Sequence, residues 1–249
     1  PLRQKLRETL KGMPDMARGL SRLALGRGGP RDLGALRDGL SLGETVCRLF
    51  TETRDPLVTL PAELASALAA LDLQAIPELA AFRELLEDGL GADLPALARD
   101  GGFVAAGVRP ELDQARALRD DSRRVVAALE AQLAGESGVA LKIRHNAVLG
   151  YFVETTAKAA EPLMGAPLNA TFIHRQTLAN QVRFTTVELA ELDAKIAQAA
   201  ERALAIELDT FEAWREAATG VAAPIQSAAQ AAALLDVAAA LAEWSDDVG

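Results

Sequence analysis

The chain has 249 residues, of which 50% are apolar and 4% aromatic, and its formal net charge is −9. This length and apolar content allow a sizeable buried core, so the composition excludes a disordered protein and favours one or two helix-rich globular domains. The only cysteine, Cys47, excludes a disulfide framework and a metal site of several thiolates, and it fits a reducing compartment.

The N-terminal sequence, PLRQKLRETL, has no initiator Met and no apolar core of a signal peptide. We therefore expect a piece of a longer cytoplasmic protein. Gln226, Gln230 and Asp236 interrupt the Ala-rich run of residues 221–241, so no run is expected to reach the ~18 to 20 uncharged residues of a membrane span. The prediction for this run is a buried helix, with no membrane partner.

Charge is unevenly distributed along the sequence. Residues 1–50 carry a net +5, residues 51–134 carry −7, residues 135–190 carry +1 and residues 191–249 carry −8. Acidic helices are ordinarily solvated surfaces, and net negative charge disfavours nucleic acid. The segregation is nevertheless compatible with a local polyanion contact within residues 135–190.

The first 90 residues predict a bundle of short helices. Leu, Met and Ala recur at helical spacing, and prolines and glycines separate the repeats. The expected helices cover residues 2–11 and 14–25, a segment from Pro30 through Leu40, and residues 42–53, 61–71 and 77–88. Short antiparallel helices with short connections form bundles.

Two long helical patterns follow. The first covers residues 110–134, ~37 Å at 1.5 Å per residue, and the second covers residues 187–219, ~50 Å. Neither can bury its apolar stripe alone, so the two are expected to pack on each other, and a last helix should run to about Trp244. The Gly-rich residues 89–109 predict a turn or a short strand pair.

Between the long helices the sequence changes to a strand pattern. Apolar, β-branched and aromatic residues alternate with period two in LKIRHNAVLGYFVETT and in TFIHRQTLANQVRFTT. This predicts a small sheet carried on a two-helix stalk. Its aromatic residues are expected in the core more often than stacked on bases, and His145 and His174 are expected to be surface groups because no third metal ligand accompanies them.

Cations alternate with short polar side chains on the predicted strands. Lys142, Arg144 and Asn146 fall on one face of their strand, while Arg175 and Arg183 each share a face with a threonine two residues later. Such faces suit backbone phosphates, and the sequence contains no base-reading element such as a recognition helix. An ordinary sheet with a polar solvent face is the alternative interpretation.

The run LKIRHNAVLGYFVETT, followed by FIHRQTLANQVRFTTVELAEL, resembles the clamp and lever regions of the MutS family of DNA mismatch-repair proteins. GRGGPRDLGALRDGL and AAALLDVAAALAEWS are similar to other lever segments of that family. The resemblance spans essentially the whole chain. It implies a mostly α fold, in which a helical lever bundle (residues 1–134 and 187–249) carries on two long helices a small inserted antiparallel β clamp domain (residues 135–186).

The resemblance implies a role in DNA mismatch repair, with a clamp that embraces duplex DNA by non-specific phosphate contacts and a lever that relays motion from an ATPase domain. The residues expected to bind DNA are Lys142, Arg144, Asn146, Arg175, Asn180 and Arg183. The family's mismatch-reading and ATP-binding motifs do not occur in this sequence, so no cofactor and no enzyme activity are expected of it. ATP and Mg would belong to the parent protein, for which a homodimer and MutL are implied as partners.

Another class of protein fits the same composition. A helical protein-interaction or scaffold domain would use its acidic helices to bind a partner and would not touch DNA. An independent enzyme is disfavoured, because the sequence shows no Ser-His-Asp set, no carboxylate pair with a suitable context and no metal cluster.

Overall fold

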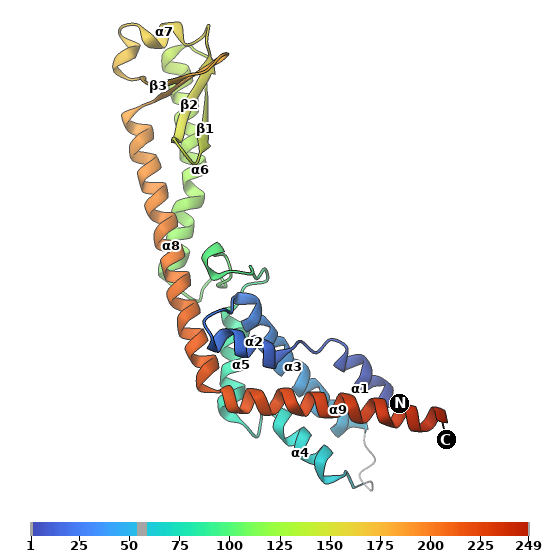
Figure 1. The fold of residues 1–249 in the computed structure, drawn as a ribbon. Coiled ribbons are helices and arrows are strands. Elements are labelled where there is room, and N and C mark those ends of the chain that lie inside the picture. Colours follow the sequence, from blue (N-terminus) through green and yellow to red (C-terminus); the bar gives the residue numbers. More distant parts are fainter. Residues whose placement is uncertain (1, 54–58, 249) are drawn as a thin grey trace. The chain divides into compact units, whose positions relative to one another are not determined.

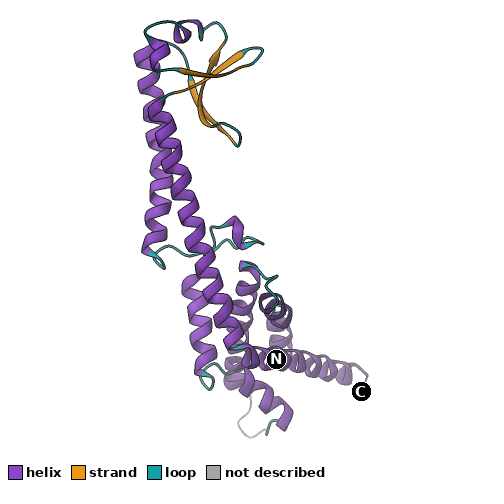
Figure 2. Ribbon diagram, turned by 60° about the vertical axis from the view of Figure 1, so that its left-hand side comes forward, coloured by secondary structure: helices purple, strands orange, loops and turns teal. Residues whose placement is uncertain are grey.

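The computed structural model describes residues 2–53 and 59–248, which form helices and one four-stranded sheet (Figures 1 and 2). The chain separates into two compact units. The helical unit comprises residues 1–108 and 207–249, and the sheet unit comprises residues 109–206. One helix, α8 (Val187–Gly220), begins in the sheet unit and ends in the helical unit.

Short helices from the first part of the chain form most of the helical unit. They are α1 (Leu2–Leu10), α2 (Met16–Ala24), α3 (Pro30–Thr53), α4 (Ala62–Leu71), α5 (Pro77–Gly89), the 3₁₀ turn η1 (Ala98–Asp100) and the last helix α9 (Ala222–Val248). Capping residues and prolines mark where several of these helices begin. The Asp15 side chain caps α2 by accepting a hydrogen bond from the Arg18 N–H at 2.9 Å, and Pro77 occupies the first turn of α5.

The structure joins two of the predicted helices. The sequence predicted one helix from Pro30 and a separate one over residues 42–53, whereas α3 continues through Ser41 and Gly43. Ser41 Oγ donates to the carbonyl four residues earlier at 2.9 Å, a bond that a helix accommodates. Gly43 makes room for Leu71, whose Cδ2 would lie 2.9 Å from an added Cβ. This glycine is therefore a packing position within the helix.

Helix α9 packs against α1, α2, α3 and α4, so the last helix lies in the same compact unit as the N-terminal helices. One face of α9 is buried, including Ile225, Ala228 and Leu235. The other face leaves apolar side chains exposed, among them Val237 and Trp244, so the prediction of a buried helix holds for one face only.

The sequence was expected to contain no run long and apolar enough to span a membrane, and this expectation was wrong for the last helix. Within the described residues, the segment Ala222–Asp246 of α9 is long and apolar enough to cross a membrane by length and composition. A helix that packs in a protein core passes the same test. Isolated glutamines and one aspartate lower the mean hydropathy of such an Ala-rich helix only slightly, so they do not exclude a span by composition.

The Gly-rich segment after α5, predicted to be a turn or a short strand pair, folds back through one isolated antiparallel β-bridge between Leu90 and Val104. Phe103 from this segment is fully buried and meets Phe211 and Trp214 of α8 edge to face, with ring centroids 6.0 and 6.4 Å away. The buried Glu207 carboxylate of α8 accepts the Gly102 N–H at 2.5 Å. These contacts hold the segment against the helix.

The sheet unit contains one antiparallel sheet with the strand order β1-β2-β4-β3. Its elements are α6 (Pro110–Ser137), β1 (Lys142–Asn146), β2 (Gly150–Thr156), α7 (Glu161–Met164), the 3₁₀ turn η2 (Leu168–Ala170), β3 (Ile173–Thr177), β4 (Gln181–Thr185) and the first part of α8. Both views show α6 and α8 running side by side, as predicted, with the strands at one end of the pair (Figures 1 and 2).

Local residues determine where the two long helices stop and start next to the sheet. Gly138 adopts the left-handed conformation (φ 66°) just after α6 and donates its N–H to the carbonyl of Ala134, which is a typical C-terminal cap. Thr186 is buried, and its Oγ accepts the Leu189 N–H at 3.1 Å to cap α8. The chain therefore enters and leaves the sheet through defined caps.

One face of the sheet packs on the two helices. Val153, Val182 and Phe184 form a buried cluster with Leu133 of α6 and Leu189 of α8. The helix ends therefore belong to the same core as the strands. This is why the compact unit extends over residues 109–206, beyond the residues 135–186 that the family resemblance implies for the clamp.

Candidate nucleic-acid interface

The sheet face that points away from this core carries most of the cations expected to bind DNA. The strand register places Lys142 opposite Glu154, and Glu154 opposite Arg183. Arg144 lies opposite Phe152 on the same face. We call the side chains of Lys142, Arg144, Phe152, Glu154, Gln176 and Arg183 the outer face.

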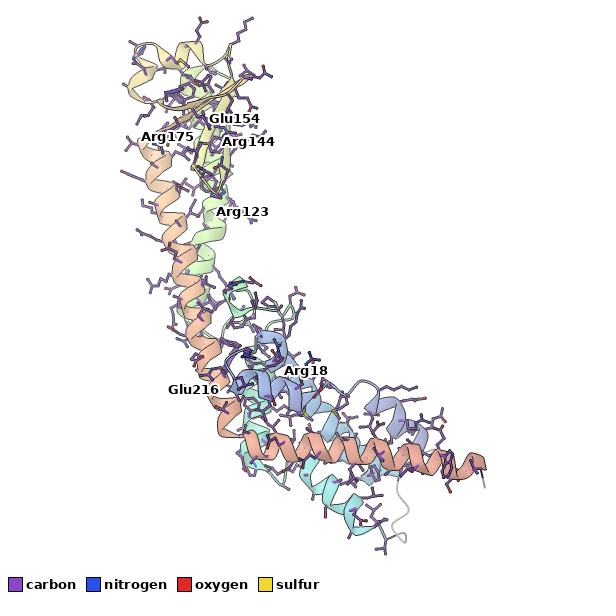
Figure 3. The ribbon with its side chains drawn as sticks, viewed as in Figure 1. Arg18, Arg123, Arg144, Glu154, Arg175 and Glu216 are labelled. Carbon is purple, nitrogen blue, oxygen red and sulfur yellow. The ribbon has the colours of Figure 1, made fainter. Side chains whose placement is uncertain are left out.

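A buried carboxylate lies at the centre of the outer face. Glu154 is only 8% exposed, and each of its oxygens faces a different arginine. Arg144 Nε is 3.0 Å from Oε1, and Arg183 Nε donates to Oε2 at 3.1 Å. Figure 3 shows Arg144 and Glu154 next to each other on the sheet. A carboxylate this deeply buried would be unfavourable without such partners.

The two arginines differ in their surroundings. Arg183 is 20% exposed, its guanidinium carbon lies 4.6 Å from the centroid of the buried Phe152 ring, and Nη1 donates to Gln176 Oε1 at 3.0 Å. Arg144 is 62% exposed, and its recorded partner within the described chain is the ion pair with Glu154. Arg183 is therefore part of the packing of the outer face, whereas Arg144 remains available to a ligand.

Lys142 is tied to helix α6. Its Nζ donates to Glu130 Oε1 at 2.8 Å, while the Ile143 N–H donates to Glu130 Oε2 at 2.7 Å. Burial works against ionisation of Glu130, but the two hydrogen bonds and the charges of Lys142 and Arg144 outweigh it and hold the pKa of this carboxyl below its usual value. Lys142 remains 70% exposed, so its ion pair is a weak one.

Asn146 has a structural role at the end of β1. Its Oδ1 accepts the N–H groups of Val148 and Leu149, at 2.9 and 2.8 Å, and so forms the turn into β2. Gly150 follows with φ +67°, and an added Cβ would lie 2.2 Å from Asp193 Oδ2 on α8. The other carboxylate oxygen, Oδ1, accepts the Tyr151 N–H at 3.3 Å, which fastens the hairpin to that helix.

Arg175 occupies a bulge in the edge strand β3. His174 lies opposite Phe184 and Gln176 opposite Arg183, so Arg175 is an extra residue between two regular pairs. The predicted alternation with Thr177 is therefore interrupted, because Thr177 lies opposite the core residue Val182 and hydrogen-bonds to His174. Arg175 itself is exposed and is labelled in Figure 3.

Asn180 is exposed in the turn between β3 and β4. Its carbonyl accepts the Ala157 N–H at 3.3 Å, which brings this turn next to the end of β2. Lys158 follows Ala157 and is also exposed, but the sequence interpretation did not include it. Lys158 lies in the turn after β2 (Gly150–Thr156), so the strand alternation gives no position for it.

The structure thus brings Lys142, Arg144 and Arg183 together on one face, whereas Asn146 and Asn180 lie in the turns at two strand ends. The sequence interpretation missed Glu154 completely. A signal was present, because pairing Asn146 with Gly150 across a short turn places residue 154 opposite residue 142. The aromatic residues Phe152, Phe172 and Phe184 are buried, as predicted.

The fold and the outer face define a helical protein with an inserted sheet module that presents cations. Residues 107–202 match the model of MutS family domain IV. The chain is 69% identical over 248 residues to DNA mismatch repair protein MutS of Caulobacter sp. (strain K31), covering 100% of this chain and 27% of that protein. It is 53% identical over 243 residues to the protein of the same name from Rhodopseudomonas palustris (strain BisB5), covering 97% and 26%. These matches confirm the resemblance to the MutS family and identify residues 107–202 as its domain IV.

The chain spans about a quarter of the length of the curated relatives it matches. The matched family domain covers nearly the same residues as the sheet unit. The predicted fold class, a helical bundle with two long helices carrying a small antiparallel sheet, is confirmed by the structure.

Proposed function

We propose that this chain is the lever and clamp part of a DNA mismatch-repair protein and that its sheet holds duplex DNA by the phosphate backbone. Residues 135–186 would act as the clamp, and residues 1–134 and 187–249 as the lever. The contact would be independent of base sequence, because cations on a small sheet can neutralise phosphates without entering a groove.

The observation that carries this proposal is the exposure of Arg144 and Lys142 on the outer face, where 62% and 70% of the two side chains remain accessible despite their ion pairs. Arg175 on the edge strand adds a third exposed cation, and Asn180 adds a hydrogen-bonding group at the neighbouring turn. Arg183 and Asn146 would support these contacts from within the module, since both already make internal hydrogen bonds.

The number of exposed cations gives the expected salt dependence. Three neutralised phosphates predict that the log of the binding constant falls against the log of salt concentration with a slope of roughly −2.7. Such binding would be weak at physiological salt, and the acidic segments of the chain would weaken it further by repulsion.

The test is a salt titration of the chain with a matched and a mismatched duplex. Arg144→Ala and Arg175→Ala should each flatten the slope by about 0.9 and weaken binding to both duplexes equally. Arg124→Ala is the control, because this arginine on α6 is 85% exposed and pairs with Asp121. Binding that ignores both substitutions, or does not depend on salt, would favour the protein-interaction domain over the DNA clamp.

The parent protein would supply what this chain does not. We propose that its ATPase domain uses ATP and Mg, that it works in the cytoplasm as a homodimer, and that MutL is among its partners. The lever would then relay the motion of that ATPase to the clamp. The chain alone is expected to hydrolyse no ATP, which a phosphate-release assay on highly purified chain would check.

A further inference from the structure

We propose that Glu154 is a positioning residue, which holds the Arg144 guanidinium in place for a phosphate and fixes Arg183, on the strand at its other side, as a structural neighbour. This inference rests on the proposed DNA contact of the clamp. It assigns a function to an acidic residue at the centre of a surface that would bind a polyanion. It also divides two arginines of the same face into one contact residue and one supporting residue.

The geometry shows how one carboxylate serves both arginines. Arg183 is fixed by two hydrogen bonds and by the ring of Phe152, whereas Arg144 is attracted by the charge of Glu154 at 3.0 Å. Within the part of the chain that the structure describes, no hydrogen bond is recorded from the Arg144 guanidinium. The two Nη groups can therefore donate to a phosphate while Nε stays next to the Glu154 carboxylate.

Charge alone would predict the opposite role for Glu154. A carboxylate repels phosphate, so its removal from a surface that binds DNA should strengthen binding. A free arginine, however, loses rotamer entropy when a ligand fixes it, and a residue that fixes it in advance removes that cost. Glu154 is buried, so it faces the arginines more directly than it faces solvent or DNA. Neutralising Glu154 should therefore strengthen DNA binding if Glu154 only repels phosphate, and should weaken DNA binding if Glu154 positions Arg144.

Glu154→Gln separates these roles. The glutamine keeps the shape of the side chain and an oxygen that can accept from Arg183 Nε, but it has no charge to attract Arg144. Glu161→Gln is the matched control, because Glu161 is an exposed acid at the start of α7 in the same module and its loss changes the net charge equally. The readout is the affinity of the chain for a duplex, measured across a range of salt concentrations.

We expect Glu161→Gln to bind duplex as well as the unmodified chain or more tightly, and Glu154→Gln to bind about threefold to tenfold more weakly than Glu161→Gln. Arg144→Ala should weaken the unmodified chain but should have little further effect in the Glu154→Gln background. If Glu154→Gln binds as tightly as the control, or if Arg144→Ala costs the same in both backgrounds, Glu154 has no positioning role.

A second measurement needs neither DNA nor a substitution. The Nε–H signals of the arginines are observed by NMR in the unmodified chain, with Arg124 as the exposed reference. An Arg144 signal that is ordered relative to Arg124 supports the inference, and one as averaged as Arg124 overturns it. The NMR measurement also separates the positioning role of Glu154 from the DNA-clamp function. If the chain shows no salt-dependent DNA binding, the clamp function is refuted even when the Arg144 signal is ordered.

Discussion

Replacing Gly150 by Ala should destabilise the sheet unit, because two features of this position oppose a side chain. Its φ of +67° lies in the left-handed region, where an L-residue costs about 1 to 2 kcal/mol. The new Cβ would also lie 2.2 Å from Asp193 Oδ2, so that carboxylate must rotate away and release the Tyr151 N–H, at a further cost of about 1 kcal/mol. Together they predict a loss of about 2 to 3 kcal/mol.

The assay is urea unfolding followed through Tyr151, the only tyrosine of the chain, labelled with fluorine for NMR. A loss of this size should lower the midpoint by on the order of 1 M urea. Gly135→Ala in α6 is the control with the opposite sign, because its Cβ would meet no atom within 4 Å, and alanine should stabilise the helix by about 0.5 to 1 kcal/mol.

Asp193→Ala tests how the cost of Gly150→Ala is divided. Without the carboxylate, only the backbone cost of about 1 to 2 kcal/mol should remain. The reasoning is refuted if Gly150→Ala unfolds at the same urea concentration as the unmodified chain. It is also refuted in part if the cost is unchanged in the Asp193→Ala background, since the clash would then contribute nothing.

Three further predictions concern single interactions. Because its hydrogen bonds hold the pKa of Glu130 below its usual value, the stability that this group contributes is present above the usual pKa and is lost as pH falls through the lowered one. The Ile143 amide, followed by NMR, should lose its exchange protection in that acid range, and in Glu130→Ala, which removes the acceptor, it should lose that protection at any pH. Burial, with the added charge of two nearby carboxylates, raises the pKa of the Cys47 thiol to about 11, so alkylation at pH 8 should be roughly a hundredfold slower than for the unfolded chain, and an equal rate would contradict this. Thr186→Ala should cost about 1 kcal/mol by removing the cap of α8, with Thr51→Ala, an exposed threonine of α3, as the control in urea unfolding.

The long elements could be predicted because their signals are repeated many times. Leu189, Ala199, Ala203 and Trp214 recur at helical spacing along α8, and each of them is buried. The strand alternation was equally informative in β1, where Lys142 and Arg144 share a face. A repeated pattern averages over local exceptions, so the helices and the sheet are correct even where a boundary was wrong, as at the break predicted near Ser41 within α3.

The environment of each arginine could not be predicted in the same way, since it depends on the pairing between strands. Arg144 and Arg183 have the same chemistry and both alternate correctly with their neighbours, yet one is exposed and the other covers Phe152. The difference arises because β4 pairs with the central strand β2, while β1 forms an edge. An arginine on an inner strand has neighbours on both sides, so its guanidinium is used within the sheet, whereas one on an edge strand keeps its donors for a ligand.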